Sequence, residues 1–418
     1  MFNRIAYRSL WSRRHTVIMT IVTLAISLSL LFSIEHIRSQ ARDSFTSSVS
    51  GVDLVVGARS GQLNLLLYSV FRIGNPTNNI RWETYEHIQN HRQIAWTVPI
   101  SLGDSHEGYR VVGTTAGFFE HFKVGQRQSL QLQQGHTFDD LYDVVLGAEV
   151  ARTLDYSIGD NLTLSHGMGR TSFMHHDDLP FTVVGILQPT GTPVDKALYV
   201  SLEAIEAIHV GWQHGAPMPG QTATAAETRA MDLQPKEITA FFVGMHSRVA
   251  TFTVQRQIND YRSEPLTAIL PGVALAELWQ MLGMVENILR VVSLLVLFAA
   301  FAGLVTTLLA SMKEREREIA ILRATGARPS HIFLLIQLEV FFITLCALGL
   351  ALLTVQGVLW FSEAFLAARF GIFIGTNLFS ITTIWLAGGA LVLAMLAACV
   401  PAIAAYRRAL VTTLTPRL

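Results

Sequence analysis

Four long apolar stretches constrain what this chain can fold into more than any other feature of its sequence. Each is close to the roughly 20 residues that a helix needs to cross the hydrocarbon core of a bilayer, which is about 30 Å thick. Their only notable interruption is Glu339, which lies inside the third stretch. The sequence therefore predicts four transmembrane helices, at 16–34, 291–312, 332–362 and 381–405.

Composition agrees with a membrane protein that also has a large water-exposed part. Charged residues make up 15% of the 418 residues, whereas about a quarter is usual in soluble domains. The 31 acidic and 31 basic residues are still too many for a chain that lies wholly in the membrane. Because the net charge is zero, nothing favours nucleic acid as a partner. The two cysteines, Cys346 and Cys399, lie far apart in apolar stretches, which excludes a disulfide framework and a zinc ribbon.

The first apolar stretch has two interpretations, a cleaved signal peptide and an uncleaved anchor. Arginines precede it, as in a signal peptide, but it is longer than the usual apolar part and no small-residue cleavage site follows. We therefore expect an uncleaved first helix. Residues 1–15 are either a plain basic tail or a short amphipathic helix lying in the membrane interface.

The distribution of Lys and Arg predicts the orientation. These residues gather before the first helix, between the second and third helices, and after the fourth helix, whereas the connection between the third and fourth contains only Arg369. Positively charged flanks usually face the cytoplasm. Residues 1–15, the loop 313–331 and the tail 406–418 are then cytoplasmic, and residues 35–272 lie outside.

The external segment reads as a folded α+β domain. Short runs rich in β-branched and aromatic residues alternate with helical patterns at 84–90 and 202–209. Residues 211–237 are rich in Gly, Pro, Thr and Ala, which predicts a mobile loop. The expected strands are 52–56, 109–112, 143–146, 161–165, 181–187, 197–200 and 241–245.

Residues 273–290, which lead into the second helix, carry an apolar seam with spacings of three and four. Such a seam is typical of a helix that packs against another helix. We expect a helical stalk that packs against an extension of the first helix or against a second copy of the chain; the alternative is a helix lying on its own domain. The seam residues are Leu275, Leu278, Leu282, Val285 and Leu289.

One cluster of side chains resembles a metal site. Imidazole and carboxylate groups suit zinc or copper(II), although adjacent histidines on a loop are more often simply solvated. His209 and His214 are additional candidates, and the same histidines suit pH sensing. The cluster consists of His166, His175, His176, Asp177 and Asp178.

Catalytic motifs are missing from the chain. It contains no Gly-Lys dipeptide and hence no phosphate-binding P-loop, and His106-Glu107 has no second histidine at the spacing of a zinc protease. It also contains no G-x-S-x-G nucleophile motif. We therefore expect no enzyme activity and no cofactor in this chain.

The loop 313–331 combines charged residues with a short apolar helix face and a glycine that suits a helix end. The neutral interpretation is a charged loop that obeys the positive-inside rule; the functional one is a lever that docks on a cytoplasmic partner. Within it, the residues Glu316, Arg317, Glu318, Ile319, Ile321, Leu322, Arg323 and Gly326 form the pattern E-x-E-I … L-R-A-x-G-A, extended by Arg317 and Ile321.

With this pattern, the chain resembles the permease subunits of MacB, LolC/LolE and FtsX type, the partners of ABC ATPases. The resemblance extends to the first helix and to external segments such as VVGTTAGFFEHF, DVVLGAEVARTLDYSIGDNLTL and FTVVGILQPTGTPVDKALYVSL. It implies a bacterial inner membrane, a dimer of permeases that is either a homodimer or includes a related permease, and a cytoplasmic ATPase dimer that binds ATP and Mg²⁺. A periplasmic adaptor or binding protein is a further implied partner.

The resemblance leaves the function open between classes. We expect a permease that couples ATP hydrolysis by its partner to movement of the external domain, driving export or extraction of a substrate. The alternatives are a mechanotransmitter that activates an external enzyme, a metal-related transport system that uses the histidine-rich loop, and a receptor or scaffold unrelated to ATPases. The unusual segments 166–180 and 211–237 are where substrate or partner choice is expected to reside.

Overall fold

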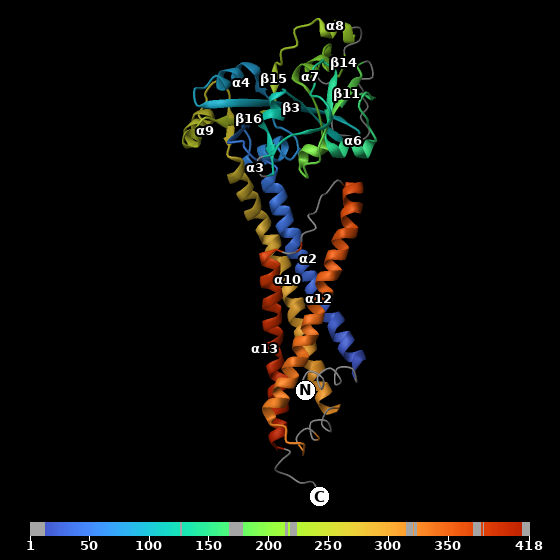
Figure 1. Ribbon diagram of the computed structural model, residues 1–418. Helices are drawn as coiled ribbons and strands as arrows, with labels where there is room; N and C mark the ends of the chain where they lie inside the picture. The colour runs from blue at the N-terminus through green and yellow to red at the C-terminus, as the bar shows by residue number, and fades with distance from the viewer. Residues whose placement is uncertain are drawn as a thin grey trace. The chain divides into compact units, whose positions relative to one another are not determined.

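The computed structural model describes residues 13–125, 128–166, 179–213, 216–217, 224–314, 321, 324–370, 378 and 380–411. It contains two compact units, which we call the helix bundle and the domain (Figure 1). The bundle comprises Met1–Gln40, Gly283–Phe365 and Ile374–Leu418, and the domain comprises Ala41–Leu282 with Leu366–Phe373.

Four helices are long and apolar enough to span a membrane, as the sequence predicts. They are α2 (Arg14–Ser47), α10 (Pro271–Glu314), α12 (Pro329–Phe370) and α13 (Ile381–Val411). The 44 residues of α10 correspond to about 66 Å at 1.5 Å per residue, twice the thickness of a hydrocarbon core. The predicted stalk 273–290 and second membrane helix 291–312 are therefore one uninterrupted helix.

The bundle packs through small side chains. In α13, alanines recur every three or four residues and are almost fully buried, so neighbouring backbones approach closely. Leu24, Leu304 and Val340, from three different helices, belong to the same buried apolar cluster. Large apolar side chains on the outer faces stay exposed, as expected where the surroundings are lipid. The buried alanines are Ala390, Ala394, Ala398, Ala402 and Ala405.

An 11-stranded mixed sheet forms the centre of the domain (Figure 1). The order along it is β17-β1-β16-β3-β4-β12-β8-β11-β7, with β10 pairing with β3 and β9 with β11. Only the pairs β4–β12 and β8–β11 are parallel among the described strands. The sheet strands are β1 (Leu54–Ala58), β3 (Ile94–His106), β4 (Tyr109–Thr114), β7 (Leu132–Gly135), β8 (Asp143–Leu146), β9 (Asn161–Leu162), β10 (Ser165–His166), β11 (Phe181–Leu187), β12 (Ala197–Ser201), β16 (Ala240–Met245) and β17 (Leu266–Ile269).

Short elements surround this sheet. Three two-stranded ribbons join β2 (Ile80–Arg81) to β15 (Glu237–Ile238), β5 (Lys123–Val124) to β6 (Gln128–Ser129), and β13 (Trp212–Gln213) to β14 (Ala216–Pro217). The helices are α3 (Gln62–Ser69), α4 (Trp82–Gln89), α5 (Gly117–His121), α6 (Ala148–Leu154), α7 (Leu202–Ile208), α8 (Ala225–Arg229), α9 (Thr251–Asn259), η1 (Pro193–Lys196) and η2 (Arg248–Ala250).

The central strands are buried on both faces because helices cover both sides of the sheet. In β16, Phe242 belongs to one apolar cluster, whereas Phe241 and Val243 belong to another. In β12, Tyr199 belongs to the same cluster as Phe242, whereas Leu198 belongs to a cluster on the other face. Since successive side chains of a strand point to opposite faces, these clusters are the two layers of the core. The expected α+β domain between the first two membrane helices is confirmed.

Most predicted strands match described ones, but the predicted strand 161–165 is two short strands, β9 and β10, and the sheet strands β3, β7 and β17 were not predicted. The most informative of these is β3, a 13-residue strand between β16 and β4. Proline normally argues against a central strand because it cannot donate a ladder hydrogen bond. Here Pro99 pairs with Phe241 of the neighbouring strand β16. The carbonyl of Pro99 accepts a hydrogen bond from Thr114 Oγ1 at 2.8 Å.

The prediction of a mobile loop over 211–237 was wrong for its second half. Residues 224–238 form α8, a connection and β15. Thr224 and Glu227 form a capping box at the start of α8, in which each side chain accepts from the other residue's backbone N–H. The T-x-x-E spacing was visible in the sequence, but the Gly- and Pro-rich residues before it dominated the composition.

Candidate functional site

All five predicted seam residues lie on α10. Leu275 is buried and belongs to the domain's core, and Leu278 is half-buried. Farther along, Leu282, Val285 and Leu289 are 38%, 56% and 44% exposed in the single chain. Such exposure leaves room for a second helix, and the predicted interface with another copy stays a prediction.

A charged cluster links α2 to α10 within the bundle. Arg38 Nε donates to Glu35 Oε2 at 3.2 Å on its own helix. Its Nη1 atom lies 3.6 Å from Glu286 Oε2 on α10. Glu35 and Glu286 therefore share one guanidinium. The cluster fixes the two helices at this level.

A buried ion pair joins the start of α2 to the interior of α12. Arg13 Nη2 donates to Glu339 Oε1 at 3.0 Å, and the two side chains are 14% and 3% exposed. Arg13 and Glu339 line a small pocket together with Thr16, Thr307 and Ser311. An ionised pair among membrane helices is costly unless its geometry satisfies both charges, and such residues usually mark function.

The predicted coupling residues Glu316, Arg317, Glu318, Ile319, Leu322 and Arg323 lie outside the described residues. Of that loop, Ile321 is 64% exposed. Gly326 has φ = 93°, the left-handed conformation that glycine adopts easily and that commonly ends a helix. Ile321 is therefore an exposed apolar side chain between the end of α10 at Glu314 and the start of α12 at Pro329.

The histidine candidates are only partly described. The side chain of His166 and residues His175, His176, Asp177, Asp178 and His214 lie outside the described part of the chain. Strand pairing places the backbone of His166 opposite Asp104. His209 Nε2 lies 3.7 Å from Oδ1 of the buried Asp104, while its Nδ1–H donates to Ile205 O at 2.7 Å. Where side chains are described, no three His, Cys, Asp or Glu groups come close enough to hold a metal ion.

His106 is a neighbouring buried histidine. Its Nδ1 lies 2.6 Å from Thr163 O and its Nε2 lies 3.0 Å from the Tyr156 hydroxyl. A carbonyl only accepts, so Nδ1 carries the proton and Tyr156 donates to Nε2 in the neutral ring. Burial lowers the pKa of His106, which favours this neutral state.

Two of the external segments that carry the resemblance meet at Asp195. Its carboxylate accepts from the backbone N–H groups of Thr190 and Gly191, at 2.9 and 2.8 Å. A Cβ added to Gly147 would lie 2.4 Å from the Asp195 carbonyl oxygen, so only glycine fits there. Burial raises the pKa of Asp195, although these donors oppose that shift. The constraint explains why a glycine and an aspartate occur in these two segments.

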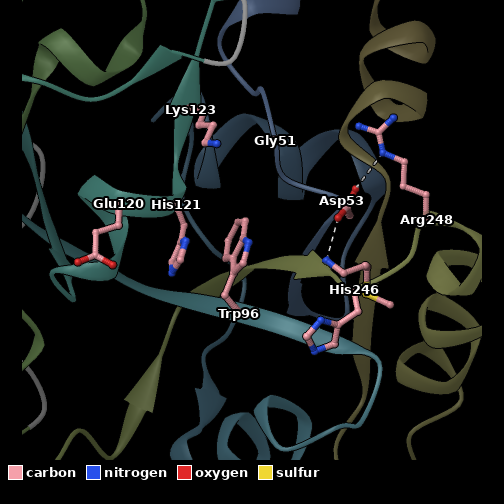
Figure 2. A pocket seen from close by; sticks show the side chains of 9 residues that line it. Gly51, Asp53, Trp96, Glu120, His121, Lys123, His246 and Arg248 are labelled. Atoms are coloured by element: carbon pink, nitrogen blue, oxygen red, sulfur yellow. Dashed lines mark hydrogen bonds and ion pairs between the residues drawn. The ribbon is translucent and has the colours of Figure 1, made fainter.

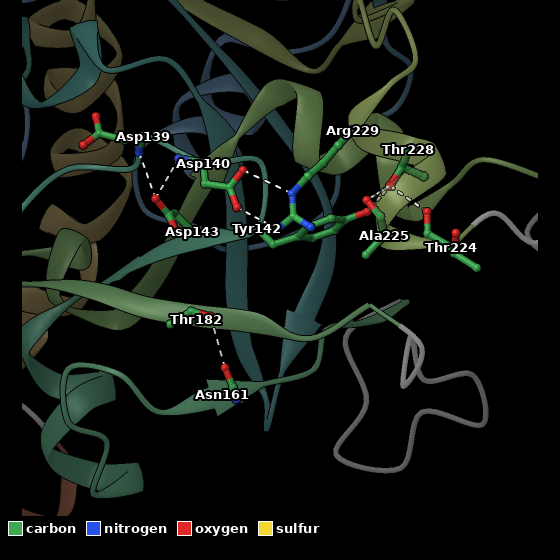
Figure 3. Close-up of polar contacts among 10 residues, drawn as sticks. All are labelled: Asp139, Asp140, Tyr142, Asp143, Asn161, Thr182, Thr224, Ala225, Thr228 and Arg229. Carbon is green, nitrogen blue, oxygen red and sulfur yellow. Dashed lines mark hydrogen bonds and ion pairs between the residues drawn. The ribbon is translucent and has the colours of Figure 1, made fainter.

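The α8 helix is fastened to the domain by a polar cluster (Figure 3). Arg229 Nη2 donates to Asp140 Oδ2 at 2.7 Å, and its guanidinium lies 5.2 Å from the centre of the Tyr142 ring. Tyr142 and Thr228 hydroxyls are 2.6 Å apart. The hydrogen bond from Arg229 lowers the pKa of Asp140, which stays ionised. The second half of the unusual segment 211–237 is therefore anchored just before β8.

Sequence reasoning missed most of these polar partners. The capping residues of α8 had a local signal, as did the turn residues around Asp195. Arg13 and Glu339 had only a weak one, since an acidic residue inside an apolar stretch needs a partner that the sequence does not name.

Comparison with known proteins gives matches along most of the chain. Residues 17–261 match the family model of the MacB-like periplasmic core domain, and residues 290–410 match that of the FtsX-like permease C-terminal region. No curated protein matches the chain.

Among solved structures, the periplasmic region of MacB from Actinobacillus actinomycetemcomitans is similar at 12% identity and a TM-score of 0.34, covering 55% of this chain and 94% of that one. The extracellular domain of the noncanonic ABC-type transporter YknZ from Gram-positive bacteria is similar at 13% identity and a TM-score of 0.31, covering 52% and 99%.

Proposed function

Since this multi-pass membrane protein belongs to the MacB- and FtsX-like family of ABC transporter permeases, we propose that it couples ATP hydrolysis by a separate ATPase to movement of its domain. The movement drives export or extraction of a substrate on the outer side of the membrane. The chain itself supplies no catalytic group in this proposal, and ATP and Mg²⁺ bind to the partner.

The observation that carries this proposal is the continuity of α10. One helix extends from Leu275 in the core of the domain to Leu304 and Leu308 in the core of the bundle. A continuous helix is stiff, because bending it requires breaking backbone hydrogen bonds. Displacement at the bundle end is then transmitted to the domain instead of being absorbed by a flexible linker.

The proposal includes an arrangement in the membrane. Both termini and the loop 313–331 lie in the cytoplasm, and the domain lies outside the inner membrane of a bacterium. The basic flanks support this orientation. Two copies of the permease pair through the exposed seam of α10, and two ATPase subunits dock below them.

Breaking α10 tests the coupling. Met284 is 73% exposed on this helix, outside the predicted membrane stretch 291–312. Met284→Pro removes a backbone hydrogen bond and costs about 3 kcal/mol locally. We expect the complex with the copurifying ATPase to form but to lose ATP-dependent change in spin-label distances within the domain pair. Met284→Ala is the matched control. Unchanged distance changes in Met284→Pro would show that α10 does not transmit the movement.

Charge insertion in the loop tests the ATPase contact. Leu322→Asp puts a charge into the proposed apolar docking face and is expected to weaken ATPase binding by about 2 kcal/mol, as at a hot-spot position. Copurification of the ATPase at equal membrane expression measures this. Ser330→Asp, at an exposed position of the same loop outside this pattern, is the control for charge alone. Equal copurification with Leu322→Asp and wild type would place the contact on another surface.

A further inference from the structure

A polar pocket of about 350 Å³ opens on the domain where the chain enters it from α2 (Figure 2). We call it the stacked-histidine pocket. Its residues come from four separate parts of the chain: the segment after α2, strand β3, the α5–β5 region and the end of β16. They are Gly51, Asp53, Trp96, Glu120, His121, Lys123, Met245, His246 and Arg248.

One wall of the pocket is rigid. The His121 ring stacks on Trp96 with the ring centres 4.8 Å apart and the planes only 6° from parallel. On β16, the residue paired with Trp96 is Gly244, where an added Cβ would lie 2.1 Å from the indole. The indole thus lies across the glycine on one side and under the imidazole on the other. This packing holds His121 at the pocket in one orientation.

Lys123 is also held in place. Its backbone carbonyl accepts from Ser50 N–H at 3.0 Å, and its aliphatic stem lies against Gly51, which has φ = 83°. Among the described residues, no acidic oxygen lies within 4.0 Å of its ammonium group. Arg248 contributes a second cation, on the side of the pocket that Figure 2 shows beside Asp53.

One of the two cations is paired with an acidic residue of the pocket. Asp53 Oδ2 accepts from Met245 N–H at 2.8 Å, and its Oδ1 lies 4.0 Å from Arg248 Nε. A ligand would therefore share Arg248 with Asp53. Figure 2 shows Glu120 on the far side of His121, away from Lys123. Lys123 is thus the cation of the pocket that is left for a ligand.

We propose that the stacked-histidine pocket binds a small organic oxyanion, with a carboxylate or phosphate group held chiefly by Lys123 and with Arg248, which is shared with Asp53, as the second cation. Charged hydrogen bonds of this kind are the strong ones in proteins, and Arg and Lys are the usual partners of such anions. The volume lies at the lower end of the range for organic ligands, so the site has room for more than an inorganic ion. Ser50, which follows α2, pairs with Lys123. A ligand bound to Lys123 would therefore lie close to the point where the chain leaves α2.

Isothermal titration calorimetry tests the proposal. The full chain in nanodiscs is titrated with inorganic phosphate at low salt and pH 6. We expect saturable binding in wild type and in Lys123→Arg. Lys123→Gln should bind about tenfold or more weakly, since a charged hydrogen bond is lost. Lys123→Gln combined with Arg248→Gln should abolish binding. Lys236→Gln, which removes an exposed lysine elsewhere on the domain, is the control and should match wild type.

The lipid composition of the nanodiscs distinguishes a lipid headgroup from a soluble molecule as the natural ligand. If a lipid headgroup is the natural ligand, nanodiscs of phosphatidylglycerol should compete with phosphate and weaken its apparent binding relative to phosphatidylcholine; a soluble ligand leaves the two equal. Both results support an oxyanion site. Absence of saturable binding to wild type in phosphatidylcholine, or equal binding by the double variant, would overturn it. The test involves no ATPase, so its failure leaves the coupling proposal untouched.

Discussion

The helix bundle and the domain use polar contacts in different ways. Some loops of the domain are held by local partners: Thr190 and Asp195 are five residues apart, and Thr224 and Glu227 are three apart, although Arg229 and Asp140 are 89 apart. In the bundle, the contacts that join one helix to another are distant in sequence: Arg13 and Glu339 are 326 residues apart, and Gln337 Nε2 donates to Met395 O at 3.3 Å across 58 residues. Local partners survive partial unfolding, whereas contacts between helices exist only when the helices are assembled.

This difference predicts that the bundle is more sensitive to the loss of one polar group. Glu339→Gln leaves the Arg13 guanidinium, 14% exposed, without its carboxylate. Breaking one partner of a buried ion pair typically costs about 3–5 kcal/mol. We therefore expect a marked loss of stability in lipid nanodiscs, measured as the midpoint of thermal unfolding.

The matched control replaces both partners. Arg13→Met with Glu339→Leu removes both charges and keeps apolar volume, which is often neutral or stabilising for a buried pair. If the single and double variants lose the same stability, the pair is not what holds α2 to α12. If the double variant is stable but no longer supports ATP-driven movement, the pair acts in the mechanism.

The contrast between local and distant contacts also explains which parts of the fold the sequence could predict. Membrane helices and most strands follow from local periodicity and apolar length, and they were predicted almost to the residue for β8 and β11. β3 was missed because Pro99 is tolerated only through tertiary contacts, which a local pattern does not contain. Likewise, the stacked-histidine pocket joins Asp53, Trp96, His121 and Arg248, whose proximity depends on sheet order. No spacing in the sequence signals it.

A smaller effect is expected from pH at His106 in the domain. Burial lowers its pKa in the folded state, so the unfolded chain binds more protons once the pH drops below the ordinary histidine value of about 6.5. Stability is then constant above that pH and declines as the pH falls towards the lower folded pKa, by at most about 1.4 kcal/mol per pH unit for one proton.

Comparison with His106→Asn isolates this effect from the other titrating groups. The amide can still donate to Thr163 O but carries no proton that titrates in this range. We expect the difference in unfolding midpoint between wild type and His106→Asn to change between pH 8 and pH 5, with wild type losing relative stability at low pH. A difference that stays constant over this range would mean that His106 is not held neutral by burial.

The smallest expected effect concerns the local fastening of α8. Thr224→Ala removes the side chain that accepts from Glu227 N–H and that forms half of the capping box. Loss of such a cap costs about 1 kcal/mol. Because Arg229 and Thr228 still hold the helix to Asp140 and Tyr142, we expect the cost to fall on opening of residues 224–230 alone. Hydrogen exchange of these amides should then be about fivefold faster, while exchange in β8 and β11 stays unchanged. Thr224→Ser, which keeps the accepting hydroxyl, should exchange like wild type. If exchange instead accelerates across β8 as well, α8 is an integral part of the domain's core, and the local character assigned to the domain's polar contacts does not hold at this position.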